Sequence, residues 1–125
     1  MDPFPNPMQT LPDFQEFHRW LDNKNGFNTD IYLNMVLLSG EIGELAQVFK
    51  KVHFMTDSSR NEQEQVKTLA QALTVQHENL GQELADCLAY LLKLANYTGV
   101  DLQEAYLQKM SRNLSRTWHN KNETL

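Results

Sequence analysis

The chain has 125 residues, of which 41% are hydrophobic and 10% aromatic, which is enough apolar surface for the core of one compact domain. Its formal net charge of −5 argues against a surface that neutralises a nucleic-acid backbone, so polymeric nucleic acid is not an expected partner. Because no window is long and apolar enough to span a membrane and Cys87 is the single cysteine, we expect a cytoplasmic protein without membrane contact.

The N-terminal part of the sequence predicts a tail followed by one helix. Three prolines interrupt the first eight residues, so residues 1–10 are predicted to form a flexible tail. Thr10 and Asp13 then form an acidic variant of a capping box, and apolar side chains recur at helical spacing over about residues 12–21. The stretch 22–29 is rich in Asn and carries a Gly, which predicts a loop.

The middle of the chain predicts two further helical stretches. Residues 30–53 lack proline and keep an apolar stripe at helical spacing, so they are predicted to form a second helix. Ser59 and Glu62 match a capping box, which predicts that a third stretch begins near Arg60. Residues 74–81 have weak helix propensity, so we expect a kink or break there.

The C-terminal part predicts the last two helical segments. A strong helical run continues to Ala95, Gly99 is suited to a left-handed cap, and Asp101 begins a last helix ahead of a frayed tail at residues 119–125. The sequence carries no strand signal. The predicted fold is therefore all-α, an antiparallel bundle of four to five helices in a single domain over residues 11–118.

Two pairs of acidic residues lie inside apolar helical segments. Glu41 and Glu44 are three residues apart on the second predicted helix, and Glu83 and Asp86 repeat this spacing further along the chain. A three-residue step leaves two helical side chains on one face. If the two helices pack antiparallel, these four side chains, here called the carboxylate quartet, meet and need a cation to neutralise them.

Acidic residues on an amphipathic helix often simply face water, which is the alternative interpretation of both pairs. Two features argue against it. Both pairs have apolar neighbours, and Gly40 and Gly43 each cost a helix about 1 kcal/mol relative to Ala, a loss expected only where another helix or a ligand approaches closely.

The chemistry of the quartet favours one class of metal. Carboxylate oxygens without His or Cys favour Mg²⁺, with Mn²⁺ as a possible substitute. Di-iron helical bundles use Glu-x-x-His pairs, and no glutamate of this sequence is followed by a histidine three residues later. An oxygen-activating iron site is therefore not expected.

Three sequence elements occur in an order typical of one family. They are an ExxE pair in EIGELAQVFK from Glu41, an ExxD pair in ELADCLAYLLKLANYTGVDLQEAYLQKMSRN from Glu83, and K-M-x-x-N-x-x-R from Lys109 to Arg116. This pattern resembles the MazG-like all-α nucleoside triphosphate pyrophosphohydrolases, including their dCTP pyrophosphatase branch. The resemblance covers about residues 34–116, although the connection between the two acidic pairs is longer than is usual in the family.

The resemblance implies a set of substrate-binding residues, namely Tyr90, Lys109, Asn113, Arg116, Trp20 and His18. It places Tyr90 beside the sugar, and Trp20 and His18 in the region of base-contacting aromatics. Lys109 and Asn113 share one face of the last helix, which suits phosphate and a sugar or base edge. The alternatives are a core aromatic for Tyr90 and Trp20, and surface charge or a snorkelling side chain for Lys109 and Arg116.

The resemblance implies hydrolysis of a nucleoside triphosphate to the monophosphate and pyrophosphate by a homodimer or homotetramer, and its dCTP pyrophosphatase branch implies a dCTP-like preference. Glu41 or Glu44 is the expected catalytic residue that orients the attacking water, because the two glycines flank them. A related alternative is a phosphoribosyl-ATP pyrophosphohydrolase. The non-enzymatic alternative is a helical interaction module whose acidic residues only form a surface.

Overall fold

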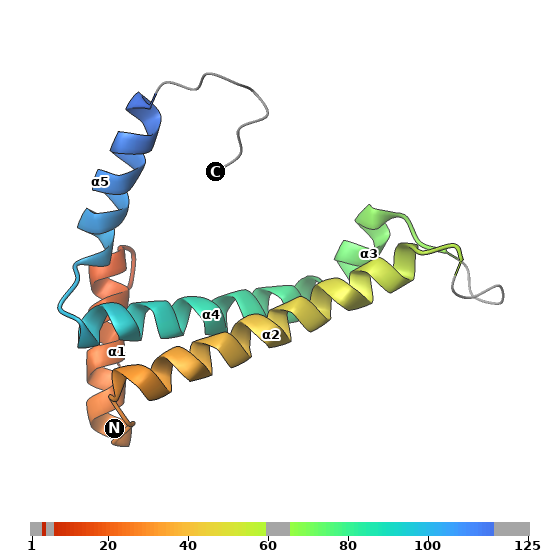
Figure 1. The fold of residues 1–125 in the computed structure, drawn as a ribbon. Coiled ribbons are helices and arrows are strands. Elements are labelled where there is room, and N and C mark those ends of the chain that lie inside the picture. Colours follow the sequence, from red (N-terminus) through yellow and green to blue (C-terminus); the bar gives the residue numbers. More distant parts are fainter. Residues whose placement is uncertain (1–3, 5–6, 60–65, 117–125) are drawn as a thin grey trace.

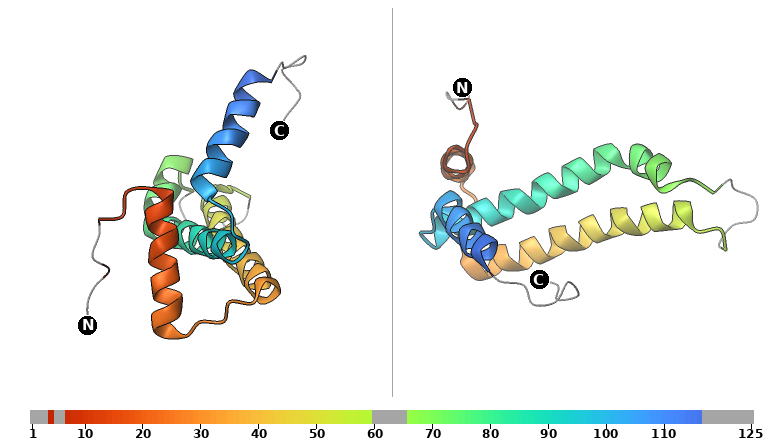
Figure 2. Two further views of the ribbon diagram at one scale, coloured as in Figure 1. Left: turned by 90° about the vertical axis from the view of Figure 1, so that its left-hand side faces the viewer. Right: turned by 90° about the horizontal axis from the view of Figure 1, so that it is seen from above.

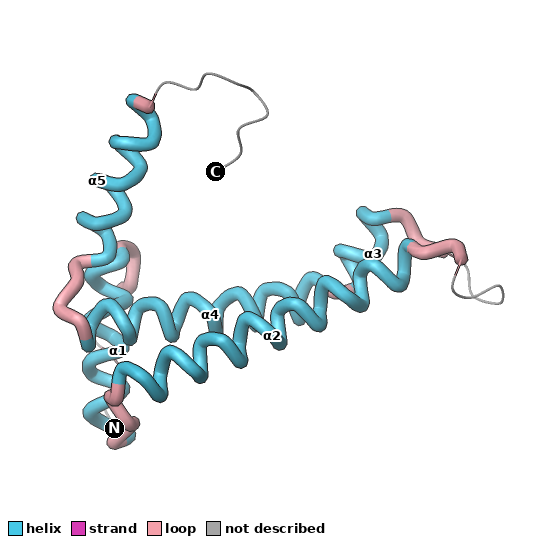
Figure 3. Tube along the Cα trace, viewed as in Figure 1, coloured by secondary structure: helices cyan, strands magenta, loops and turns pink. Residues whose placement is uncertain are grey.

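The computed structural model describes residue 4, residues 7–59 and residues 66–116. These residues form helices and connecting loops, with no strand among them (Figure 3), which confirms the predicted all-α class. The helices are α1 (Leu11–Asn25), α2 (Ile31–Thr56), α3 (Leu69–Val75), α4 (His77–Tyr97) and α5 (Leu102–Ser115).

The two long helices α2 and α4 run side by side in opposite directions and form an extended hairpin (Figure 1). Helix α1 crosses the end of the hairpin at which α2 begins and α4 ends, and α3 packs near the opposite end (Figure 2). Helix α5 contacts α1 and leads away from the hairpin. The predicted antiparallel pairing is thus present, but the described part of one chain is not a closed bundle, because α5 stands outside it.

Helix α1 begins as predicted and ends later than predicted. The Thr10 hydroxyl accepts from the Asp13 N–H and the Asp13 carboxylate accepts from the Thr10 N–H, which confirms the capping box. The prediction of a loop from residue 22 was wrong, because the helix continues to Asn25. It ends where Gly26 takes up the left-handed conformation at φ 63°, a geometry that glycine adopts without steric cost.

The start of the third helix also differs from the prediction. Glu62 of the predicted capping box lies outside the described residues. The described helix begins after Thr68, whose hydroxyl accepts from the Gln71 N–H, while the Gln71 side chain accepts from the Thr68 N–H. The predicted break is confirmed at Gln76, which separates α3 from α4.

The junction between α4 and α5 agrees with the sequence. Gly99 has φ 71°, as a left-handed residue after a helix requires, and the Asp101 carboxylate accepts from the Glu104 N–H at the start of α5. Helix α5 ends at Ser115, and the predicted frayed tail at residues 119–125 lies outside the described residues.

The core of the described chain is small. Its buried hydrophobic residues are Leu38, Val48, Val52, Ala72, Leu92 and Ala95. Many large apolar side chains of α2, α4 and α5 stay exposed, and the α5 residue Leu114 is 88% exposed. None of the described helices combines the length and hydrophobicity needed to cross a membrane.

A buried amide joins three helices at the end of the hairpin where α2 begins and α4 ends. Gln15 is only 4% exposed, and its Nε2 donates to Asn96 Oδ1 at 3.0 Å and to the Val100 carbonyl at 2.9 Å. Gln15 Oε1 accepts from the Leu102 N–H at 3.0 Å, and Asn96 Nδ2 donates to the Gln15 carbonyl at 2.8 Å. This amide hub therefore fixes α1 against the α4–α5 junction.

We expect Gln15→Leu to lower the free energy of unfolding by about 1–2 kcal/mol, because it leaves the Leu102 N–H and the Val100 carbonyl without their protein partners in a partly buried setting. Urea unfolding followed by circular dichroism measures the change. The matched control is Gln108→Leu on α5, where the exposed amide donates to the exposed Glu104 carboxylate, and it should shift the value by less than about 0.5 kcal/mol. Equal effects of both substitutions would show that the hub has no special role.

Candidate metal centre

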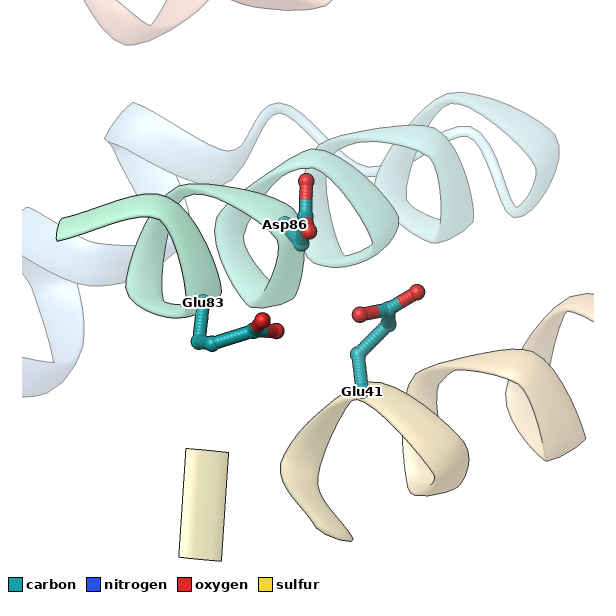
Figure 4. Close-up of side chains that lie close together, drawn as sticks. All are labelled: Glu41, Glu83 and Asp86. Carbon is teal, nitrogen blue, oxygen red and sulfur yellow. The ribbon is translucent and has the colours of Figure 1, made fainter. Parts of the chain in front are cut away.

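The hairpin brings the two acidic pairs of the sequence together. Glu41 and Glu44 lie on α2, and Glu83 and Asp86 lie on α4. Carboxylate oxygens of Glu41, Glu83 and Asp86 lie within 4.8 Å of one another, and Figure 4 shows the Glu41 and Glu83 side chains directed towards each other across the gap between the helices. Antiparallel packing produces this meeting, because it aligns the middle of α2 with the first half of α4.

Glu44 completes the cluster on the α2 side. The Glu44 carboxylate raises the pKa of both Glu41 and Glu83, as a neighbouring like charge does. Glu44 and Asp86 are exposed, whereas Glu41 and Glu83 are partly buried. The quartet therefore has two shielded members and two that face solvent.

The quartet is electrostatically unfavourable without a cation. Burial raises the pKa of Glu41 and of Glu83, and the neighbouring carboxylates raise it further. One oxygen of each, Oε2, is shielded from solvent and accepts no hydrogen bond from the described residues. Shielded carboxylate oxygens without donors are available to coordinate a cation.

The donor set fits a hard divalent cation. The available ligand atoms are carboxylate oxygens from two helices, which Mg²⁺ and Mn²⁺ prefer. Cys87 lies one residue after Asp86, but burial raises the pKa of its thiol and the carboxylates raise it further. The thiol thus stays protonated, and the site presents oxygen ligands only.

The structure does not supply the close helix approach that Gly40 and Gly43 were expected to indicate. A Cβ atom added at either position would have no described neighbour within 4 Å. Of the two expected causes, a neighbouring helix or a ligand, the described residues of this chain do not supply the first at either glycine. The space beside these glycines is open to a ligand or to a second copy of the chain.

The substrate-binding residues expected on the last helix lie apart from the quartet. Lys109, Asn113 and Arg116 belong to α5 or its C-terminal cap, and α5 leads away from the hairpin (Figure 1). Lys109 and Arg116 are exposed, while Asn113 is partly buried and its Nδ2 lies 3.8 Å from the Met110 sulfur. Within one chain, α5 and the carboxylates do not form a common site.

The two residues expected from the first helix face different sides of α1. Trp20 packs with the rings of Phe17 and Phe4, at centroid distances of 5.8 and 6.0 Å, and the Lys24 ammonium lies 5.0 Å from its centroid. His18 is partly buried, within range of the charges on α4. A two-residue step turns a helix by about 200°, which accounts for this separation.

A second cluster of charged and aromatic side chains joins α1 to α4. Lys93 Nζ lies 3.2 Å from Asp22 Oδ1, the Tyr97 hydroxyl donates to the other Asp22 oxygen, and the Lys93 ammonium lies 5.3 Å from the Tyr90 ring centroid. Burial lowers the pKa of His18, with Lys93 acting in the same direction and Asp22 opposing it. We name this group the Lys93 cluster.

Sequence reasoning missed Asp22 and Lys93. Asp22 was assigned to a loop, so it had no predicted partner on another helix. A signal for Lys93 existed in the run Leu91-Leu92-Lys93-Leu94-Ala95, where a single charge interrupts an apolar stretch. A lysine in such a run is rarely buried unless it is paired, so its position calls for a carboxylate from a neighbouring element.

Comparison with known families bears on both clusters. A family model described as the MazG nucleotide pyrophosphohydrolase domain matches residues 31–119, a range that contains the whole quartet, Tyr90 and Lys93. No curated protein and no solved structure matches the chain significantly.

We predict that Glu83→Gln raises the thermal unfolding midpoint of the metal-free protein at pH 7.5, because it removes one of four repelling charges. A group whose pKa is raised by folding contributes stability below its unfolded-state pKa and loses it as the pH rises through its folded-state pKa. The gain should therefore shrink at lower pH, because the raised pKa makes Glu41 and Glu83 of the wild type take up protons at a higher pH than ordinary glutamates do. Differential scanning fluorimetry at pH 7.5 and pH 5 measures it.

The control for this prediction is Glu16→Gln, an exposed carboxylate on α1, which should leave the midpoint nearly unchanged at both pH values. Mg²⁺ should stabilise the wild type more at pH 7.5 than at pH 5, and should stabilise Glu83→Gln less than the wild type. A lower midpoint for metal-free Glu83→Gln at pH 7.5 would contradict the idea that repulsion dominates the empty quartet.

Proposed function

The chain belongs to the MazG nucleotide pyrophosphohydrolase family, and we propose that it is a Mg²⁺-dependent enzyme that hydrolyses a nucleoside triphosphate to the monophosphate and pyrophosphate. The observation that carries the proposal is the meeting of carboxylates from α2 and α4, two of which hold shielded oxygens that accept no hydrogen bond among the described residues. A helical surface that only faces water has no reason to gather like charges in this way.

In this proposal Glu41, Glu44, Glu83 and Asp86 hold the metal. Bound Mg²⁺ supplies positive charge to the triphosphate oxygens and a template for in-line attack on phosphorus. Mn²⁺ is a possible substitute because it accepts the same oxygen ligands. Ca²⁺ should support the reaction poorly, since its looser coordination would misalign the phosphates.

The quartet has a second task, which is to orient the attacking water. We assign this role to Glu41 or Glu44, the two members on α2. Glu44 is exposed and Glu41 is partly buried, so one of them can reach water while the other remains shielded beside Glu83. The open space at the glycines next to this pair leaves room for a substrate to approach.

The position of the nucleoside decides which phosphorus is attacked. Tyr90 follows Asp86 by one helical turn on the same face of α4, so a sugar held against Tyr90 lies next to the quartet. This places the α-phosphorus, rather than the γ-phosphorus, beside the oriented water. A preference for dCTP-like substrates belongs to the same proposal and rests on the sequence resemblance at Tyr90.

We also propose that the working enzyme is a homodimer or homotetramer. Large apolar side chains remain exposed on α2, α4 and α5, among them Met35, Leu37, Phe49, Leu88 and Leu107. Apolar surface of this extent on a small domain marks a contact with another protein surface. A second copy could also bring Lys109, Asn113 and Arg116 of its α5 towards the quartet, from which α5 of the same chain leads away.

The product of the reaction tests the proposed function. In ¹⁸O-labelled water with Mg²⁺ and a panel of nucleoside triphosphates, we expect the label in the monophosphate and none in pyrophosphate, as attack at the α-phosphorus requires. Mass spectrometry of the products measures it. Phosphoribosyl-ATP in the same panel tests the related alternative, and a lack of turnover of every substrate would favour the interaction module. Labelled orthophosphate with accumulating diphosphate would overturn the assigned position of attack.

Removal of ligand charges should abolish activity without unfolding the protein. Glu44→Gln and Asp86→Asn keep side-chain volume, and we expect each to lower kcat by about 100-fold or more while helical content stays near that of the wild type. Excess chelator should have the same effect on the wild type. The matched control is Glu78→Gln, an exposed glutamate on α4 outside the quartet, which should keep its activity. Turnover at the wild-type rate in either quartet variant would show that the quartet is structural.

A further inference from the structure

One face of α4 carries Asp86 of the quartet and the α4 residues of the Lys93 cluster. Asp86, Tyr90, Lys93 and Tyr97 are separated by steps of four, three and four residues, which keeps them within about 60° of one another around the helix axis. Lys93 lies about 10 Å along the axis from Asp86. This separation is comparable to the length of a nucleoside monophosphate.

Lys93 is an unusual residue for this position. Its side chain is only 13% exposed, and its ammonium lies 3.2 Å from Asp22 Oδ1, 4.9 Å from the Phe27 ring centroid and 5.3 Å from the Tyr90 ring centroid. The three partners come from α1, from the α1–α2 loop and from α4 itself. The charge is therefore held where a loop and two helices meet.

The partners of Lys93 are themselves fixed. The Asp22 side chain is only 8% exposed and also accepts a hydrogen bond from the Tyr97 hydroxyl. Phe27 follows Gly26, whose left-handed conformation turns the chain out of α1, and the Phe27 N–H donates to the Asp22 carbonyl at 3.1 Å. Because each partner is held by the backbone or by a second contact, the position of the ammonium is preorganised.

An ammonium has three N–H donors. Among the described residues, Lys93 meets one acceptor oxygen, that of Asp22, and two ring faces. The ring faces attract the charge but do not accept directional hydrogen bonds as an oxygen does. A ligand oxygen that approaches between Phe27 and Tyr90 would thus find a donor already in place.

Resting on the proposed function above, we propose that Lys93 is a specificity-determining residue that donates a hydrogen bond to a carbonyl oxygen of the substrate base. With the phosphates at the quartet and the sugar against Tyr90, the base reaches the Lys93 cluster, where the ring of Phe27 offers further apolar contact. Cytosine, thymine, uracil and guanine carry a carbonyl oxygen, whereas adenine carries none. The site therefore discriminates against adenine nucleotides.

If Lys93 served only to stabilise the fold, through its ion pair between α1 and α4, substitutions would have a different effect from that expected for base recognition. Loss of one partner of a buried pair destabilises a protein because the other charge is left uncompensated, and replacement of both partners restores much of the stability. The double variant Asp22→Asn/Lys93→Met should thus recover much of the stability that Lys93→Met loses. The double variant cannot recover recognition of a carbonyl oxygen, because it lacks the Lys93 ammonium that donates the hydrogen bond.

The experiment measures binding and turnover in the same proteins. Isothermal titration calorimetry with Mg²⁺ gives the Kd of dGMP, dAMP and dCMP for the wild type, Lys93→Met and the double variant, and pyrophosphate release gives kcat/KM for the corresponding triphosphates. Guanine and adenine are both purines, and guanine carries a carbonyl oxygen at the ring position where adenine carries an amino group, so the change of their ratio between wild type and Lys93→Met reports on that position. Lys50→Met is the control, because the Lys50 ammonium lies over the Phe54 ring at 5.5 Å on α2.

We expect the wild type and Lys50→Met to prefer dGMP and dCMP over dAMP by about tenfold or more, the size of effect of one charge-assisted hydrogen bond. Lys93→Met and the double variant should lose this preference, with the double variant unfolding near the wild-type temperature. A double variant with wild-type stability and wild-type preference would overturn the proposal, as would a wild type that binds all three alike. Should Lys93→Met fail to fold, the double variant alone decides.

The two proposals fail separately in this experiment. A wild type that discriminates between bases in binding but releases no pyrophosphate from any triphosphate would overturn the proposed function and leave the role of Lys93 intact. A wild type that releases pyrophosphate equally from dGTP and dATP, and binds their monophosphates equally, would overturn the role of Lys93 alone. A wild type that binds no nucleotide would overturn both.

Discussion

Repulsion between the carboxylates of α2 and α4 is the constraint around which this structure is organised. The buried side chains Leu38, Val48 and Leu92 hold the two helices together, while the quartet between them resists the same approach. The hairpin forms because the hydrophobic contacts outweigh the repulsion between the carboxylates. The remaining repulsion favours the uptake of protons or of a divalent cation at the quartet. In the proposed function, relief of this repulsion contributes to the binding of the cation.

The rest of the molecule keeps this hairpin in register. The amide hub of Gln15 and Asn96 and the ion pair of Asp22 and Lys93 both link α1 to the last turns of α4. They act at one end only, whereas α3 covers the other end of α2. Because the two polar links share α1, its orientation is fixed about its own axis as well as along its length, and this orientation presents His18 rather than Trp20 to α4.

Local rules predicted much of the fold and the two acidic pairs of the candidate metal centre. Capping at Thr10 and Asp101, the left-handed Gly99 and the i, i+3 acidic pairs each depend on a few neighbouring residues, and each can be read from the sequence. The continuation of α1 through Asp22, the pairing of Lys93 and the direction of α5 depend on contacts between distant segments. Propensity cannot supply these, since tertiary packing overrides it at an Asn-rich helix end.

The position of the connection between α2 and α4 has a consequence for how this family of chains can vary. The connection from α2 to α4 lies beyond the quartet, at the end opposite α1 (Figure 1), and the site takes no ligand from it among the described residues. The entropy of closing a loop rises only slowly with its length. Insertions in this connection can therefore accumulate during evolution without a change in the quartet. The connection is for the same reason a suitable place for a fused reporter.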